Sequence, residues 1–293
     1  MLGIGGGGDV VGSLAVARRC EDLGTPFELG GVAWERLPID PRPGPRPTSE
    51  ITGGESVGAH ALRADAETTT VDGVRFSESH VARELDTTTV LIDITDGVDG
   101  AAEGIAAAAD ALGCDLVIAV DVGGDAIATG SEPGLGSPLC DALMIAAARA
   151  GAAEPLLAVI GAGCDGELTI AEVLARVAAL AAAGAWIGSF SVTPAVADEL
   201  ERIGRAAGTE ASLQVVRCAR GETGEAEIRG GRRTVPLGPV GALVFGFDLE
   251  RAADAQPLVA ALEETDGLEG ARAALEAIGV RTELDYERDR ARG

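Results

Sequence analysis

Four consecutive glycines, Gly5–Gly8, constrain the start of this chain more than any other feature. They lie between the short apolar segment 2–4 and Asp9, which begins an apolar-periodic stretch over 10–23. Such a run predicts a tight turn from a short strand into a helix, because glycine adopts backbone conformations that other residues avoid. The N–H groups at a helix start can bind an anion. We therefore expect a ligand close to the backbone of this loop.

Later segments predict a parallel sheet. Residues 90–94, 116–120 and 155–160 are uninterrupted apolar runs, and helical patterns over about 98–112 and 138–150 separate them. Strands that do not alternate are typical of a sheet covered on both faces, and regular alternation of strands with helices makes that sheet parallel. The predicted fold class is α/β: a Rossmann-like, doubly wound, mostly parallel sheet with helices on both faces and an irregular C-terminal part.

The whole chain, 1–293, is predicted to form a single α/β domain. Residues 36–77 are an insertion, in which a proline-rich loop over 36–52 precedes a β-hairpin. Proline cannot continue a helix or donate a hydrogen bond in a central strand, and a long loop of this kind is typical of a lid, a binding loop or a linker. The C-terminal part, 184–293, is looser, with a hairpin near 225–237 and a charged tail.

The acidic composition excludes several kinds of function. The chain carries 47 Asp and Glu against 23 basic residues, a net charge of −24, which disfavours nucleic acid and anionic membranes as partners. It contains no Lys and no Asn. Without Lys there is no lysine Schiff base and no Walker-type phosphate-binding lysine. Acid–base work must fall to carboxylates, the two His, a Cys or a metal-bound water.

Composition also indicates where the protein works. Five cysteines without a CxxC pattern indicate reduced thiols rather than disulfides or a zinc site. No apolar run is long enough to span a membrane, and there is no signal-peptide pattern. A Lys-free, acidic, Ala- and Gly-rich chain is typical of a halophilic organism, so we expect a cytoplasmic protein with a solvated acidic surface. The sequence leaves a homo-oligomer open.

Carboxylates recur in the loops that follow the predicted strands. Because doubly wound sheets bind ligands beyond the carboxyl ends of their strands, these loops are expected to meet in one site. Several acidic loops at one end of a sheet repel one another unless they are spaced apart, protonated or bound to a metal. Mg²⁺ prefers one or two carboxylates together with ligand phosphates. The acidic loop residues are Asp9, Asp93, Asp96, Asp121, Asp125, Asp165 and Glu167.

We assign hypothetical roles to these loops. Asp9, Asp121 and Asp125 would hold a Mg²⁺ ion. Asp93 or Asp96 would position or deprotonate a water or hydroxyl group as the catalytic residue. An anionic small molecule would contact Gly5, Gly6, Gly7, Gly8, Gly123, Gly124, Gly163, Ser137 and Asp141. An Asp at a loop-to-helix junction is also typical of a helix cap, so each carboxylate has a structural explanation as well.

The leading functional hypothesis is a metal-assisted enzyme that acts on a phosphorylated or nucleotide-like small molecule by phosphoryl transfer or hydrolysis. The alternative is an NAD(P)-dependent oxidoreductase, because Gly3–Gly8 fits a GxGxxG pattern with Glu28 or Glu35 near the second strand as a ribose partner. Asp9 counts against this alternative, because it places an acid where a pyrophosphate would bind. A third hypothesis is a small-molecule sensor or an assembly subunit without catalytic activity.

Three motifs together resemble a known family. They are Gly-Ile-Gly-Gly-Gly-Gly-Asp-Val-Val-Gly at 3–12, Asp-Val-Gly-Gly-Asp at 121–125 and Ser-Pro-Leu-Cys-Asp-Ala at 137–142. Over most of its length the chain is similar to an archaeal family known as a domain of unknown function, DUF1152. The resemblance implies a Rossmann-like α/β fold. It supplies no catalytic residues and no assigned activity.

Overall fold

Nine strands form one sheet within residues 1–292, the part of the chain that the computed structural model describes. Across the sheet they are β10 (Trp186–Ser191), β13 (Leu243–Asp248), β9 (Pro155–Ile160), β8 (Val117–Val122), β1 (Leu2–Gly3), β2 (Gly30–Val32), β7 (Thr89–Ile92), β5 (Ala61–Ala64) and β4 (Glu55–Ser56). The five strands from β9 to β7 are parallel, and antiparallel strands extend both edges. The predicted α/β class with a large, mostly parallel central sheet is confirmed.

The first strand lies at the centre of this sheet although it has only two residues. Leu2 of β1 pairs with Gly30 of β2 on one side and with Ala119 of β8 on the other, and Gly3 pairs with Val120. Every residue of β1, β2, β7 and β8 is buried. Uninterrupted burial explains why the sequence shows apolar runs here without alternation.

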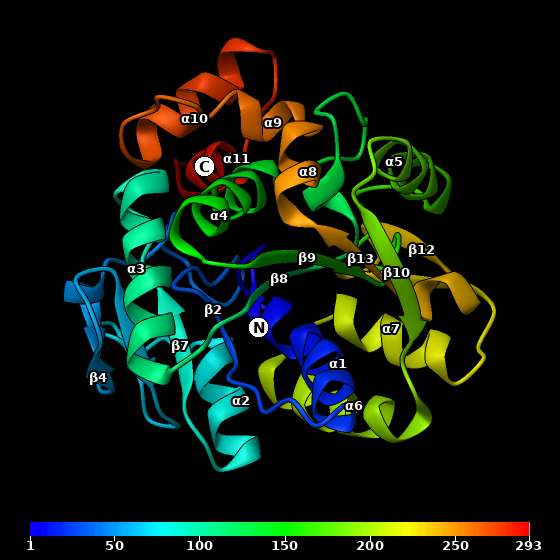
Figure 1. The fold of residues 1–293 in the computed structure, drawn as a ribbon, viewed down its shortest axis with the longest axis horizontal. Coiled ribbons are helices and arrows are strands. Elements are labelled where there is room, and N and C mark those ends of the chain that lie inside the picture. The colour runs from blue at the N-terminus through cyan, green and yellow to red at the C-terminus, as the bar shows by residue number, and fades with distance from the viewer. Residues whose placement is uncertain (293) are drawn as a thin grey trace.

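Helices cover the sheet on both sides. Their bounds are α1 Asp9–Asp22, α2 Ser77–Leu85, α3 Gly97–Leu112, α4 Pro138–Gly151, α5 Ile170–Ala182, α6 Pro194–Ala207, α7 Ala211–Ala219, α8 Leu249–Asp254, α9 Pro257–Ala260, α10 Gly267–Ala277 and α11 Glu283–Arg292. Figure 1 shows α1, α2, α6 and α7 on one side of the sheet and α3, α4, α8 and α10 on the other. No helix within residues 1–292 combines the length and the hydropathy that a bilayer crossing requires.

Local sequence signals explain where several helices begin and end. Pro138 occupies the first turn of α4, where a missing N–H costs nothing. Thr169 and Glu172 form a reciprocal capping box at the start of α5. α3 ends at Gly113, which adopts the left-handed conformation that closes many helices.

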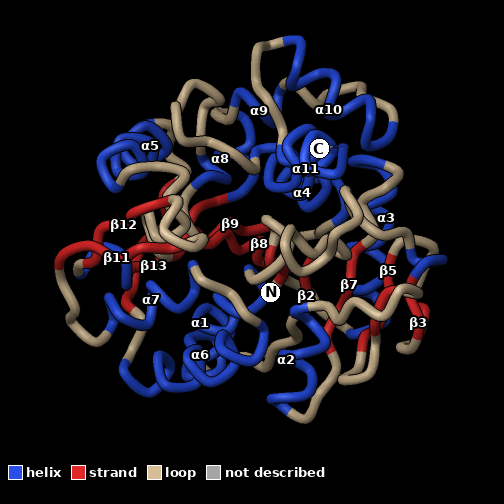
Figure 2. Tube along the Cα trace, turned by 180° about the vertical axis from the view of Figure 1, so that it is seen from behind, coloured by secondary structure: helices blue, strands red, loops and turns tan. Residues whose placement is uncertain are grey.

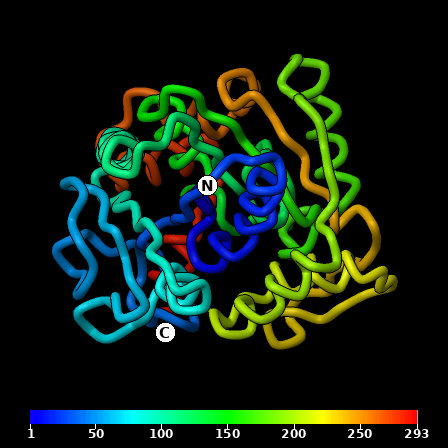
Figure 3. The backbone as a smooth tube through the Cα atoms, turned by 60° about the horizontal axis from the view of Figure 1, so that its bottom comes forward, coloured from blue at the N-terminus to red at the C-terminus, as the bar shows by residue number. Residues whose placement is uncertain are grey.

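The C-terminal helix lies beside the N-terminal loop. Seen from behind in Figure 2, α11 lies against α4. Figure 3 places the blue start of the chain in the middle of the molecule, close to the red C-terminal segment. Arg36 joins the two, because its Nη2 donates to the carbonyl of Gly5 and to Glu283. The prediction of a charged tail was therefore wrong in one respect: the last segment is a helix, and its residues Glu283 and Glu287 are buried.

The looser segments contain more order than the sequence predicted. β10 was not predicted, and its Trp186 and Ile187 are exposed because it is an edge strand. The predicted hairpin in 36–77 is reduced to one antiparallel bridge between Thr69 and Arg75, because α2 starts at Ser77. The first strand of the hairpin, β6 (Thr69–Thr70), pairs with β3 (Ile51–Thr52). The C-terminal hairpin is confirmed as β11 (Gly224–Ile228) and β12 (Arg233–Leu237).

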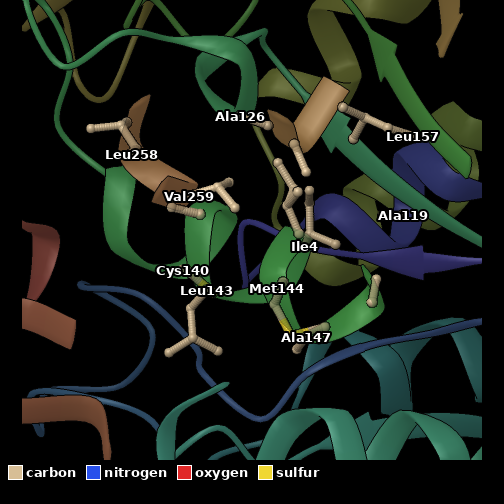
Figure 4. Packing of buried hydrophobic residues seen from close by; sticks show 14 of the residues in the cluster. Ile4, Ala119, Ala126, Cys140, Leu143, Met144, Ala147, Leu157, Leu258 and Val259 are labelled. Carbon is tan, nitrogen blue, oxygen red and sulfur yellow. The ribbon is translucent and has the colours of Figure 1, made fainter. Parts of the chain in front are cut away.

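Two apolar layers hold the helices on the sheet. Figure 4 shows part of one layer, in which Ile4, Ala119 and Leu157 from the sheet region lie with Leu143 and Met144 of α4. The opposite layer joins α1 to the other face of β8 and β9. The side-chain layers fix α1 and α4, whose first turns carry Asp9 and Asp141, on opposite faces of β8.

Because α1 packs closely against β8, adding a methyl group at Gly12 of α1 should destabilise the fold. A Cβ at Gly12 would lie 2.3 Å from Cγ2 of Val122, a buried side chain of β8. Gly12→Ala should therefore lower the unfolding free energy by about 1–3 kcal/mol through overpacking, against the helix-propensity gain of about 1 kcal/mol.

Gly270→Ala is the matched control. Gly270 also lies in a helix, α10, but the nearest atom to a Cβ there is the Cβ of Thr265, 3.7 Å away. This change should raise the unfolding free energy slightly. Denaturant unfolding of both variants measures the difference, and an equal stabilisation by both would contradict the packing of α1 on β8.

Candidate functional site

The loops after β1 and β8 bring three carboxylates together. Asp9 is the first residue of α1, Asp121 lies in β8, and Asp141 lies in the first turn of α4. One carboxylate oxygen from each lies within 4.8 Å of the other two. Asp121 and Asp141 are buried, and Asp9 is partly exposed. We call these three residues the first carboxylate group.

A second carboxylate group lies next to the first and consists of Asp125, Asp165 and Glu167. All three are buried, and one oxygen from each lies within 4.8 Å of the others. Asp125 follows β8, and the other two follow β9. The charge of Asp125 helps to raise the pKa of Asp121, so the two groups are close enough to repel each other.

Polar donors already surround the second carboxylate group. Glu167 accepts hydrogen bonds from the N–H of Gly136 at 2.6 Å and from the N–H and hydroxyl of Ser137, both at 2.9 Å. The guanidinium of Arg229 lies 3.2 Å from the same carboxylate. The Ser137 hydroxyl also lies 3.0 Å from Asp125, so its one proton is shared between the carboxylates of Glu167 and Asp125. Here the bound anion is the carboxylate of Glu167, which the surrounding donors hold in place.

The first carboxylate group is less well supplied with donors. The N–H of Gly5 donates to Asp9 at 2.9 Å, and the N–H of Gly124 donates to Asp121 at 2.8 Å. Neither carboxylate oxygen of Asp141 has a hydrogen-bond partner among the described residues, although Asp141 is only 1% exposed. An unpartnered buried carboxylate is costly, so this oxygen pair is expected to have a ligand.

Glycine is required where the loops pass the carboxylates. A Cβ on Gly5 would lie 2.6 Å from Oδ2 of Asp9, and one on Gly123 would lie 2.4 Å from Cγ of Asp165. Gly123 also has φ of +141°, which disfavours any other residue. The glycine loops therefore leave room for the carboxylates.

Burial and mutual repulsion raise the pKa of every member of the first carboxylate group. Burial is the larger cause for Asp9, whose pKa rises to about 8, and the charge of Asp125 adds to it. Burial also holds the pKa of Asp121 and of Asp141 well above the usual range, with further repulsion from Asp125. These carboxyl groups bind protons near neutral pH unless another cation replaces them.

The second group shows the same effect. Burial, followed by repulsion from Glu167, raises the pKa of Asp125 to about 7. Burial and the charge of Asp125 hold the pKa of Asp165 well above its usual range. Strongly raised pKa values in one cluster are typical of functional sites, although buried ion networks also produce them.

The sequence did not identify the cation that faces the glycine loop. Arg36 stacks its guanidinium 3.9 Å from the ring of Trp34 and donates to the carbonyl of Gly5. Its Nη2 lies 3.3 Å from Glu283. The N–H groups of Leu139 and Cys140 at the start of α4 also donate to Glu283, at 3.0 and 2.8 Å. Glu283 therefore caps α4 and neutralises Arg36 at once.

Glu287, one turn later on α11, anchors that helix to the N-terminal half of the chain. Its carboxylate accepts hydrogen bonds from Nε1 of Trp34 at 3.1 Å and from the N–H of Gly44 at 2.8 Å. The proline-rich loop is thus tied to α11. No local pattern could have revealed these residues, because their partners lie about 140 to 250 positions away in the chain.

The site residues predicted from the sequence lie in three places: the first carboxylate group, the second carboxylate group and the end of β7. The predicted metal ligands Asp9 and Asp121 lie together, but their third partner is Asp141, while Asp125 belongs to the second group. The predicted contact residues Gly5, Gly123, Gly124 and Ser137 border the two groups.

The other loop glycines approach protein atoms. The N–H of Gly7 donates to the carbonyl of Trp34, and a Cβ on Gly6 would lie 2.9 Å from that oxygen. A Cβ on Gly8 would lie 2.1 Å from the Thr209 hydroxyl. The N–H of Gly163 donates to the carbonyl of Gly123.

The two predicted catalytic residues lie after β7, which β2 separates from β1. The spacing of strands puts them about 10 Å along the sheet from the glycine loop. Asp93 is buried and accepts hydrogen bonds from the N–H of Thr48 and from Thr95. Asp96 is exposed and lies 3.7 Å from Nε2 of His60. The structure does not bring either residue into the carboxylate groups.

A comparison with protein-family models identifies the family of this chain. Residues 1–291 match the family described as "Protein of unknown function (DUF1152)". Searches of curated proteins and of solved structures gave no match.

The raised pKa values predict that the unfolding free energy falls as the pH rises from about 4 to about 8. An unfolded Asp has a pKa of 3.8, whereas the folded values of Asp125 and Asp9 are about 7 and about 8. Between these limits the folded state keeps protons that the unfolded chain has lost, so raising the pH favours unfolding.

Denaturant unfolding at several pH values, at constant salt and with a metal chelator, measures this dependence. The double variant Asp9→Asn, Asp125→Asn should lose much of it. A stability that is constant or rises over the same range in the parent protein would contradict the burial of these groups.

Removal of the α11 anchor predicts a loss of stability. Glu283→Ala removes the acceptor of two N–H groups of α4 and one of the two carboxylates beside Arg36, so the unfolding free energy should fall by about 3 kcal/mol. Glu276→Ala is the control, because that Glu is exposed on α10 and, within residues 1–292, has Arg272 as its ion-pair partner. Its effect should stay within about 0.5 kcal/mol, and equal effects of the two changes would contradict the anchoring role.

Proposed function

This chain belongs to the DUF1152 family of proteins of unknown function, and we propose that it is a metal-assisted enzyme that binds a phosphorylated or nucleotide-like small molecule. The observation that carries the proposal is the convergence of buried carboxylates at the ends of β1 and β8, beside a four-glycine loop. Phosphoryl transfer or hydrolysis is the reaction class that fits, because it depends on positioning and charge neutralisation.

The order of the strands supports this location. Along the chain the parallel strands are β1, β2, β7, β8 and β9, and across the sheet they run β7-β2-β1-β8-β9. This order supports the proposal of a Rossmann-like, doubly wound sheet, in which the strand order reverses between β1 and β8. Ligands of such sheets bind in the crevice at the reversal. The first carboxylate group lies at this point.

The charges of the site favour an anionic substrate only when a cation is bound. The buried carboxylates of the two groups would repel a phosphate. A divalent cation reverses this effect, because it neutralises carboxylates and accepts phosphate oxygens in its remaining coordination positions. Arg36, next to the glycine loop, would add a second positive charge if the substrate displaced Glu283.

Three carboxylates could act as the general base. Asp93 and Asp96 remain candidates for a substrate that reaches from the glycine loop to the end of β7. Asp125 is near enough for its charge to raise the pKa of Asp9, Asp121 and Asp141, and its carboxylate lies 3.0 Å from the Ser137 hydroxyl. The geometry therefore favours Asp125 for positioning a water or hydroxyl group.

An NAD(P)-dependent oxidoreductase is the alternative that a specific observation supports. The strand order and the glycine loop after β1 are those of dinucleotide-binding folds. Against it, the N–H of Gly5 already donates to Asp9. Glu35, a candidate ribose partner, is buried and accepts a hydrogen bond from the N–H of Ser77. A non-catalytic ligand-binding or assembly protein is the third hypothesis.

Ligand-dependent thermal stability separates these functions. Mg²⁺ together with a nucleotide or sugar phosphate should raise the melting temperature beyond the effect of either alone, corresponding to about 2.7 kcal/mol at a ligand concentration of 100 Kd. The buffer should contain concentrated KCl, since the charge of −24 is typical of halophilic proteins. Phosphate release from the stabilising compound then tests for catalysis.

Asp121→Asn should abolish the cation-dependent stabilisation, and Asp110→Asn, an exposed position on α3, should preserve it. Stabilisation by reduced nicotinamide cofactor without a cation would favour the oxidoreductase instead. Binding without turnover of any phosphorylated compound would favour the third hypothesis.

A further inference from the structure

We infer that Asp9, Asp121 and Asp141 form the binding site of one hard divalent cation, Mg²⁺ or Mn²⁺, and that the adjacent second carboxylate group is not this site. The inference rests on the proposed function for the use of the cation, and it adds the identity of the ligands. It replaces Asp125 by Asp141 in the ligand set predicted from the sequence.

The unpartnered carboxylate of Asp141 carries this inference. Both of its oxygens are buried without a hydrogen-bond partner in the described part of the chain. One of them lies 3.4 Å from the Cβ that Gly5 would carry, which directs it toward the glycine loop and Asp9. A buried carboxylate that lacks donors is stable only when it is protonated or bound to a cation.

The other two ligands are oriented by the backbone. The N–H of Gly5 holds Oδ2 of Asp9, and the N–H of Gly124 holds Oδ2 of Asp121. Hydrogen bonds of this kind fix the direction of metal-binding carboxylates in known sites. Each carboxylate retains a second oxygen. The glycine loop thus positions the cation ligands in addition to offering N–H groups to an anion.

The spacing of the three carboxylates suits a single ion. Their oxygens lie within 4.8 Å of one another. Two oxygens bound to one ion at about 2.1 Å can lie up to about 4.2 Å apart, and at about 2.4 Å up to about 4.8 Å apart. Oxygens within 4.8 Å of one another can therefore reach one ion after small side-chain adjustments. Carboxylate oxygens are the donors that such hard cations prefer.

The second carboxylate group differs because the protein already satisfies it. Glu167 has donors from Gly136, Ser137 and Arg229. Asp165 accepts from the N–H of Glu167, and Asp125 accepts from Ser137. Both oxygens of Glu167 are engaged by these donors, so a cation in the second group would compete with them, whereas a cation in the first group meets no donor on Asp141. The remaining coordination positions of the ion would go to water or to phosphate oxygens.

Titration of the full chain with Mn²⁺ tests this inference. Electron paramagnetic resonance measures free Mn²⁺ in the absence of any phosphorylated compound. The parent protein should bind one Mn²⁺, and Asp141→Asn should raise its Kd at least about tenfold. Asp165→Asn, the matched change in the second group, should alter the Kd much less. If Asp141→Asn fails to fold, Asp9→Asn replaces it, because Asp9 is partly exposed.

Two results would overturn the inference: no bound Mn²⁺ in the parent protein, or a greater loss of affinity in Asp165→Asn than in the first-group variants. Failure of the proposed function gives a different pattern. In that case Mn²⁺ binding would depend on Asp141 as expected, but no phosphorylated compound would bind to the Mn²⁺-loaded protein. Conversely, phosphate release that depends on Asp165 and not on Asp141 would support the function and refute this cation site.

Discussion

Repulsion between buried carboxylates is the physical constraint on which the centre of this structure depends. Asp121, Asp141, Asp125 and Asp165 are buried at the ends of β8, β9 and the first turn of α4. Ionised carboxylates in such a place cost several kcal/mol each unless donors, protons or cations compensate them. The fold supplies donors to the second carboxylate group and leaves Asp141 without any in the described chain. The uneven supply of donors is what distinguishes a structural cluster from a site that needs a ligand.

The same balance of charge connects the two ends of the chain. Arg36 faces the glycine loop, and Glu283 and Glu287 on α11 face Arg36. Glu283 also occupies the N–H groups at the start of α4, next to Asp141. An anionic substrate that reached the glycine loop would compete with Glu283 for Arg36. The C-terminal helix is therefore both a structural anchor and a neighbour of the proposed binding site.

Local patterns predicted the centre of the fold and part of the site. The apolar runs at 90–94, 116–120 and 155–160 and the glycine loop are short-range signals, and the structure contains the corresponding strands and turns. The acidic residues after the strands were identified because parallel strands end at one edge. The grouping of Asp141 with Asp9 could not be predicted, since it depends on how α4 packs beside β8. Arg36 and Glu283 were missed for the same reason, because their partners are remote in the chain.

An anomalous diffraction map of crystals soaked in Mn²⁺ tests the central claim most directly. The predicted result is a peak between the carboxylates of Asp9, Asp121 and Asp141, with oxygen ligands at about 2.1–2.2 Å. Its open coordination positions should face the glycine loop, where a phosphate would bind. A peak among Asp125, Asp165 and Glu167 alone, or the lack of any peak at the ends of β1 and β8, would contradict the claim.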